Sequence, residues 1–256
     1  MRKAVLLSVG IWLSAACLAG AEDRNLGATF ELKYMSKYMI KGSEAYGQQG
    51  GLWETFKFDL WGTGLGLGVG HQAATSSGYV DSQRLNYMVF YDNTLFDGTP
   101  FKTDYKLNWT YKNFYGRARN IGNKQNWILT LSWPEILPIK NLAPYYIADY
   151  ECPAGSGYVN RGISGFVHVF GLGYDLSVPE LPNPLHLSGD VSYNDGFGGG
   201  AVDHDWSHVT LGISTKLDIN KNTSFLPGVY HQLSMDDSVC RRDVTYAVLS
   251  MKYKFK

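Results

Sequence analysis

The stretch FKTDYKLNWTYK, residues 101–112, alternates between two kinds of side chain along its whole length. The first set is almost wholly aromatic or aliphatic, and the set between its members is wholly polar. A period of two is that of a β-strand, because successive side chains of a strand point to opposite faces. The stretch therefore needs surroundings that are apolar on one side and wet on the other. The apolar set is Phe101, Thr103, Tyr105, Leu107, Trp109 and Tyr111.

Two settings meet this need. In a soluble protein the apolar face points into a core and the charged face points to water, as in a sandwich of two sheets. In a membrane barrel the apolar face contacts lipid, and the charged face lines a wet lumen.

The same alternation recurs throughout the chain and predicts an all-β fold of roughly 12 antiparallel strands. Their predicted ranges are 27–42, 51–62, 64–72, 84–92, 101–112, 126–133, 143–150, 162–176, 186–195, 206–217, 223–233 and 244–255.

Three features favour lipid over a soluble core. Many strands reach about ten residues, which is the length that a tilted strand needs to cross the hydrocarbon. The last strand ends on Phe255, although Lys256 departs from a terminal aromatic residue. Aromatic residues near strand ends fit the interfacial girdles of a barrel. These residues are Tyr38, Trp53, Trp61, Tyr91, Trp109, Tyr111, Trp127, Trp133 and Tyr253. We therefore expect a transmembrane β-barrel in a bacterial outer membrane of the Gram-negative type.

The N-terminus reads as a secretory signal peptide, with a basic start, an apolar stretch and a small-residue cleavage site. We predict a signal peptide over 1–21, cleavage after Ala21, and a single barrel domain over 22–256. The alternative is a lipoprotein signal that is acylated at Cys17.

Without the signal, the chain has 21 basic residues and 23 acidic ones. Such a chain has no basic footprint for nucleic acid. The expected partners are outer-membrane lipids and small polar solutes.

Two cysteines follow the signal, Cys152 and Cys240. An isolated pair in an exported chain predicts a disulfide. Numbering the connections from a periplasmic N-terminus puts both residues in outer loops, which agrees with a bridge. The alternative is two free thiols.

Charged residues of the polar faces are candidates for lining the pore. If they point inward, they set the field on a permeating solute. The alternative is a solvated face of mutual salt bridges. The candidates are Lys33, Lys37, Lys57, Asp59, Arg84, Lys102, Asp104, Lys106 and Lys112.

Sites of other kinds are weakly indicated. The stretch DHDWSH (203–208) contains four possible metal ligands, but the sequence has no second cluster to complete a metal site. The four residues are Asp203, His204, Asp205 and His208. Ser207 and His208 are adjacent, and neighbours on a strand face opposite ways. We predict no enzyme, no metal and no cofactor.

The expected function is passive diffusion of small polar solutes or ions through a water-filled lumen. The alternatives are a non-conducting structural or adhesion barrel and a lipid-acting enzyme.

One segment resembles a known family. SKYMIKGSEAYGQQGGLWETFKFDLWG (36–62) is similar to the start of the TorF-type putative porins, which open with S-x-Y-x-x-[RK]-G. Ser36, Tyr38, Lys41 and Gly42 occupy those positions. The rest of the chain resembles the family more loosely, through Leu142, Pro144, Tyr145, Tyr146, His168 and a near-terminal Phe. The resemblance implies an outer-membrane barrel and leaves the solute open.

Overall fold

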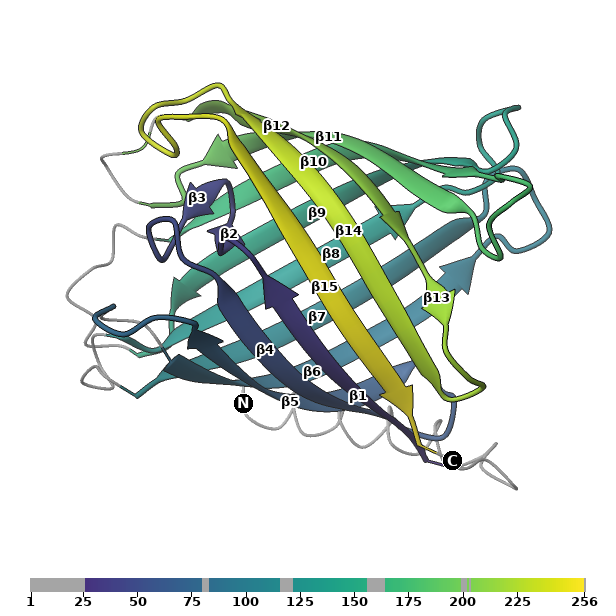
Figure 1. The fold of residues 1–256 in the computed structure, drawn as a ribbon, viewed down its shortest axis with the longest axis horizontal. Coiled ribbons are helices and arrows are strands. Elements are labelled where there is room, and N and C mark those ends of the chain that lie inside the picture. The colour runs from purple at the N-terminus through teal and green to yellow at the C-terminus, as the bar shows by residue number, and fades with distance from the viewer. Residues whose placement is uncertain are drawn as a thin grey trace, which may run out of the picture.

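Twelve antiparallel strands form a closed barrel in the computed structural model, which describes residues 26–79, 83–115, 122–155, 164–198, 202 and 204–255. Each strand pairs with its neighbours along the chain, and β1 closes the ring by pairing with β15. The strands run obliquely around the barrel (Figure 1). They are β1 (Gly27–Met35), β4 (Gly51–Asp59), β5 (Leu65–Ala74), β6 (Gln83–Leu95), β7 (Thr103–Phe114), β8 (Lys124–Ser132), β9 (Leu142–Pro153), β10 (Gly165–Leu176), β11 (Leu185–Asp195), β12 (Asp205–Thr215), β14 (Thr223–Ser234) and β15 (Val244–Lys254).

The predicted fold class is confirmed, and each predicted strand corresponds to one of these twelve. A two-residue strand, β13 (Leu217–Asp218), extends the pairing of β14. Among the described residues, no helix is long and apolar enough to cross a membrane. The predicted signal peptide and its cleavage after Ala21 lie outside the described residues.

The pairing register fixes which residues face the lumen, because alternate residues of paired strands share a face. For example, Lys33 on β1 is opposite Trp53 on β4, and Lys106 on β7 is opposite Thr130 on β8. The other set points outward and leaves large apolar side chains exposed around the barrel. Its members include Phe56, Leu67, Val89, Leu107, Trp127, Phe170, Leu211, Val229 and Leu249. An apolar outer surface on every side is that of a barrel surrounded by lipid.

Glycines on the inward face of β5 explain the alternating sequence GLGLGVG. A Cβ on Gly66 would lie 2.1 Å from the ring of Phe90, and a Cβ on Gly68 would lie 2.9 Å from Met88. The glycines therefore let side chains of β6 lie flat along the lumen wall. Lys106 extends over the Phe90 ring at 4.7 Å.

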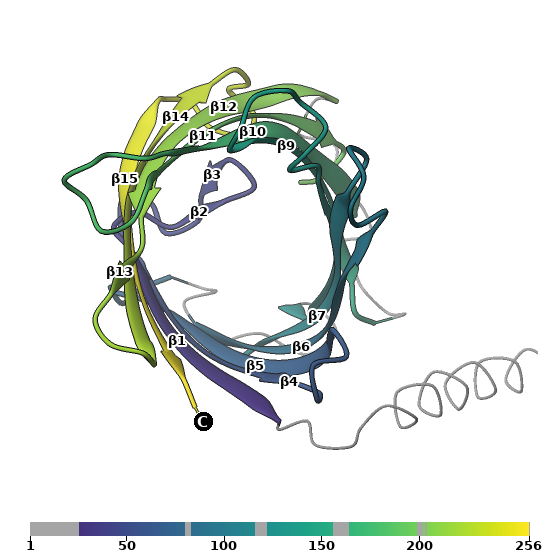
Figure 2. The ribbon, with the colours of Figure 1, turned by 90° about the vertical axis from the view of Figure 1, so that its right-hand side faces the viewer.

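The chain enters and leaves the barrel at one end. The start of β1 pairs with the end of β15, and we call this the terminal end of the barrel. At the opposite end, the connection between β1 and β4 turns into the ring of strands (Figure 2). We call this connection, residues 36–50, the lumen insert, and its side the insert end.

Candidate functional site in the barrel lumen

The lumen insert carries a small hairpin, β2 (Met39–Ile40) paired with β3 (Ser43–Glu44). Its turn is Lys41–Gly42, and both residues have positive φ, 49° and 86°. Positive φ at both central residues is the requirement of a two-residue type I′ turn. The sequence prediction continued the first strand to residue 42, followed by an outer loop, and this was wrong. The strand ends at Met35, and the chain then folds inward.

Aromatic packing and a chain of hydrogen bonds attach the insert to β5 and β6. The Tyr38 ring lies 4.7 Å from both the Tyr46 and the Trp53 rings. Arg84 Nη2 donates to the Tyr38 hydroxyl at 3.0 Å, and this hydroxyl donates to Gln72 Oε1 at 3.2 Å. Gln72 Nε2 in turn donates to the Tyr46 hydroxyl at 3.0 Å. Tyr38 and Trp53 therefore line the lumen and are not in a lipid-facing girdle as predicted.

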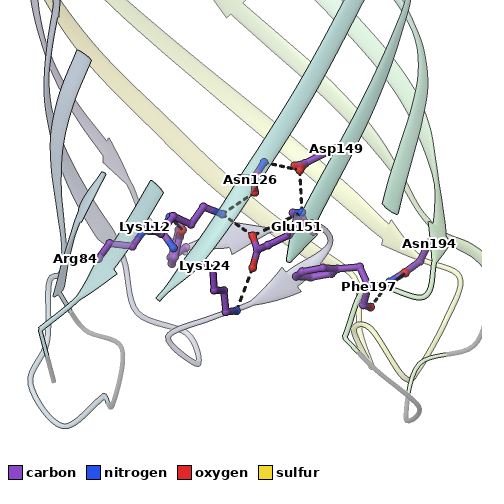
Figure 3. A network of polar contacts seen from close by, with 10 residues as sticks. Arg84, Lys112, Lys124, Asn126, Asp149, Glu151, Asn194 and Phe197 are labelled. Atoms are coloured by element: carbon purple, nitrogen blue, oxygen red, sulfur yellow. Dashed lines mark hydrogen bonds and ion pairs between the residues drawn. The ribbon is translucent and has the colours of Figure 1, made fainter. Parts of the chain in front are cut away.

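Lys41 attaches the tip of the insert to β9, on the opposite side of the ring from β1. Lys41 Nζ lies 2.9 Å from Asp149 Oδ1 and 3.7 Å from Glu151 Oε2. Glu151 also receives Lys112 Nζ at 2.5 Å and Lys124 Nζ at 3.0 Å (Figure 3). These are charge-assisted contacts among buried and half-buried side chains, where attraction is strong and an unpaired charge is costly.

A third set of contacts attaches the hairpin to β12, β14 and the loop before β15. Gln232 Nε2 donates to the Gly42 carbonyl at 2.7 Å, and Ser43 Oγ donates to the Val239 carbonyl at 3.0 Å. Arg242 pairs with Glu44. The insert is thus bonded to three sides of the barrel and crosses the lumen.

Two cavities occupy the lumen beside these groups. The insert cavity, about 470 Å³, is lined by insert residues together with residues of β4 and β6–β9. The terminal cavity, about 500 Å³, is lined mainly by residues of β1, β11, β12, β14 and β15. Lys33 lines both cavities, so they adjoin on β1.

Charges divide between two arcs of the wall. Every lysine and arginine of the barrel strands lies on β15, β1, β4, β6, β7 or β8, a region that we call the cationic arc. The facing strands β9–β12 carry carboxylates and no lysine or arginine, and β14 carries neither charge; we call these five strands the anionic arc. The cationic arc also carries inward carboxylates, among them Asp59 and Asp104, so a solute in the lumen would meet both signs of charge on that side and only carboxylates on the other.

Most of the predicted pore-lining residues lie on inward faces of the cationic arc. By register these are Lys33, Lys57, Asp59, Arg84, Asp104, Lys106 and Lys112. Two predicted residues lie elsewhere. Lys37 is part of the lumen insert beyond the end of β1. Lys102 precedes β7 at the terminal end, where it pairs with Asp97 at 3.2 Å and Glu135 at 3.7 Å. The role of the inward residues in permeation stays a prediction.

Five polar residues of the insert end were not among the predicted site residues. Only one local signal was available, since Ile40-Lys41-Gly42-Ser43 has the glycine of a hairpin turn. The other four are recognised only through neighbours on distant strands. The five residues are Lys41, Lys124, Asn126, Asp149 and Glu151.

The predicted disulfide is not formed, and Cys152 and Cys240 are free thiols. Cys152 lies on the outward face of β9, whereas Cys240 packs in the loop after β14 and donates to the Arg242 carbonyl. Three strands separate β9 from β14.

Ser207 and His208 do not face opposite ways as the sequence analysis assumed. A register shift between Ser192 and Tyr193 puts both inside, with Ser207 Oγ 2.8 Å from His208 Nδ1. Ser207 Oγ also donates to the Ser192 carbonyl, and Gly42 of the insert covers the imidazole. A nucleophile needs access to substrate, and this serine is 1% exposed. The pair is therefore structural.

In the DHDWSH segment, which the sequence only weakly indicated as a metal site, His204 pairs with a single carboxylate. His204 Nδ1 lies 2.7 Å from Asp195 Oδ1, and Asp203 lies outside the described residues. In the parts of the chain that the structure describes, no group of three or more His, Cys, Asp or Glu residues could hold a metal ion.

The fold resembles that of solved outer-membrane porins and channels. A KdgM porin is 10% identical with a TM-score of 0.55, covering 89% of this chain and 99% of that one. The KdgM porin in complex with disordered oligogalacturonate is also 10% identical, with a TM-score of 0.52 and coverage of 90% and 99%. An outer membrane channel from Pseudomonas putida F1 is 9% identical, with a TM-score of 0.50 and coverage of 92% and 98%.

These matches confirm the predicted barrel fold and agree with the predicted outer-membrane location. The sequence matches no protein-family model and no curated protein. The resemblance to the TorF-type porins therefore stays a prediction.

Proposed function

We propose that the chain forms an outer-membrane channel for passive diffusion of small polar solutes or ions, with the lumen insert as its constriction. The observation that carries this proposal is an inward face of charged and polar side chains around two cavities of about 470 and 500 Å³. Such rings of charge govern permeation in pores. We further propose that residues 1–21 direct export and are removed after Ala21.

The resemblance to the TorF-type porins supports the same function, because all four residues of the opening pattern shape the insert. Ser36 joins the insert to β15, since its Oγ accepts from the Ala247 amide at 2.8 Å. Tyr38 packs in the insert, and Lys41–Gly42 form its turn. A sequence pattern whose residues shape the constriction is expected in a family of channels.

The constriction favours anions. Four cations gather there, Lys41, Lys112, Lys124 and Arg84, against the two carboxylates of Asp149 and Glu151. An excess of positive charge lowers the barrier for an anion and raises it for a cation.

A second candidate is a closed, non-conducting structural barrel. The bonds that attach the insert to three sides of the lumen favour it.

Single-channel recording separates the two candidates. Residues 22–256, refolded into a planar lipid bilayer, should give discrete current steps. Under a salt gradient, the reversal potential should have the sign of an anion-preferring pore. Circular dichroism and heat-dependent gel migration would establish that the barrel is folded. Folded protein without current steps would reject the channel in favour of the closed barrel.

A further inference from the structure

Arg84 is a buried cation without a carboxylate. It is 8% exposed, and it makes no ion pair with any of the residues that the structure describes. Its Nη2 donates to Tyr38, its guanidinium lies 5.4 Å from the Phe114 ring, and its Nε has no partner. A guanidinium has five donors that match an oxyanion, and a buried charge is costly unless it is paired.

The nearby carboxylates are already engaged. Asp149 Oδ1 accepts from Lys41 at 2.9 Å and from Asn126 at 2.6 Å. Glu151 receives Lys112 and Lys124 (Figure 3). Three lysines therefore already neutralise the two nearby carboxylates, which leaves neither of them to pair with Arg84.

The insert cavity gives an anion room beside Arg84. Its volume of about 470 Å³ is that of a small-molecule site. Lys41 and Lys112 line it together with Arg84, and Asp149 is its only acidic residue among those described. The site therefore has a net positive lining.

The rest of the lining indicates a ligand that is partly apolar. Trp53 and Met88 line the same cavity, as do Met35 and Ile128. Asn86 also lines it and has a buried Oδ1 without a partner, although its amide group can donate to an oxyanion after rotation.

We propose that the insert cavity binds a small organic anion, with a carboxylate at Arg84 and an apolar ring against Trp53 and Met88. This assignment rests on the proposed function, since it names the class of solute that the channel holds at its constriction. Benzoate is a probe of this class, and benzamide has nearly the same shape without the charge.

Isothermal titration calorimetry of residues 22–256, refolded in detergent micelles, tests the site without requiring current. The barrel should bind benzoate at least about tenfold more tightly than benzamide, since a charged hydrogen-bonded pair is worth that factor. Arg84→Gln should weaken benzoate binding by about tenfold or more. Lys102→Gln removes a charge at the terminal end, away from the lining of the insert cavity, and should leave binding unchanged. Equal binding of benzoate and benzamide, or equal losses in both variants, would overturn the proposal.

Asn86→Asp gives a second test that does not remove the cation. Residues 84 and 86 share the inward face of β6, and Asn86 is opposite Lys112 on β7. A carboxylate there should take the place of the ligand, abolish benzoate binding and raise the temperature at which the barrel unfolds. Undiminished benzoate binding in Asn86→Asp would contradict the assigned site.

The two proposals can fail separately. Chloride current without benzoate binding would leave the channel and reject the binding site. Benzoate binding without current would retain the site and reject passive diffusion.

Discussion

The two ends of the lumen hold their charges in different ways. At the insert end, Lys112 and Glu151 are buried and lie 2.5 Å apart. In the terminal cavity, Lys33 and Lys252 each approach Glu31 only to 3.9 Å, and their side chains are 39% and 40% exposed. Close buried pairs fix one geometry, whereas exposed pairs contribute little and leave charges free to meet a solute. We therefore expect the insert end to select solutes and the terminal end to form a wet vestibule.

Removing the insert should have the largest effect on the difference between the ends. Replacing residues 37–49 with a short Gly-Ser turn leaves every barrel strand intact and opens the insert end. Single-channel conductance should rise severalfold. The matched control replaces 97–100 in the turn between β6 and β7, and it should leave the conductance unchanged. An unchanged conductance without the insert would mean that the narrowest point lies at the terminal end.

Glu151→Gln should break the buried network. Three lysines then lose the carboxylate that they share, and we expect a loss of about 3–5 kcal/mol in the free energy of unfolding. Asp175→Asn breaks the exposed Asp175–His186 contact of the terminal end and should cost at most about 1 kcal/mol. Urea unfolding in lipid vesicles measures both. Similar losses in the two variants would remove the distinction between the ends.

Leu107→Arg tests the outer surface at mid-strand, where the side chain is 49% exposed. A charge there should cost about 2–4 kcal/mol if it lies near the bilayer midplane. Lys106→Glu changes the neighbouring residue, which faces the lumen, and should spare folding. Equal destabilisation by both changes would contradict the inward and outward faces of β7.

Charge changes in the vestibule should alter selectivity without altering stability. Lys57→Glu on the inward face of β4 should move the reversal potential toward cation preference, because it reverses one charge of the cationic arc. Lys102→Glu at the rim should shift it less. If Lys102→Glu shifted the reversal potential more than Lys57→Glu, the cationic arc would not determine the electric field in the lumen.

The smallest effect is expected for the double variant Cys152→Ser, Cys240→Ser. A structural disulfide would be worth about 2–5 kcal/mol, whereas replacing free thiols, of which Cys240 is buried, should change the free energy of unfolding by about 1 kcal/mol or less. Gel migration with and without reductant gives a direct check. A reductant-dependent shift in the parent chain would establish the bridge and add a covalent link to the insert end.

The barrel could be predicted from the sequence, and the constriction could not. Strand alternation is local, so stretches such as 101–112 identify both their conformation and their two faces. The alternation pattern wrongly extended the first strand into the insert, because Tyr38 and Ile40 continue the apolar even-numbered positions of β1 past its end. What bends the chain inward is a set of partners far along the sequence, such as Asp149 and Gln232. No local sequence pattern indicates contacts between residues so far apart in the chain.

The bonds of the insert also bear on the order in which the protein assembles. Glu44 contacts Arg242 across 198 positions of the chain, and Ser43 contacts Val239 across 196. Contacts so distant in sequence form late, after intervening segments have been organised. The hairpin therefore cannot settle until the last strand has joined β1. A barrel whose seam stays open would keep a loose insert, so protease resistance of the Lys41–Gly42 turn would report completed closure.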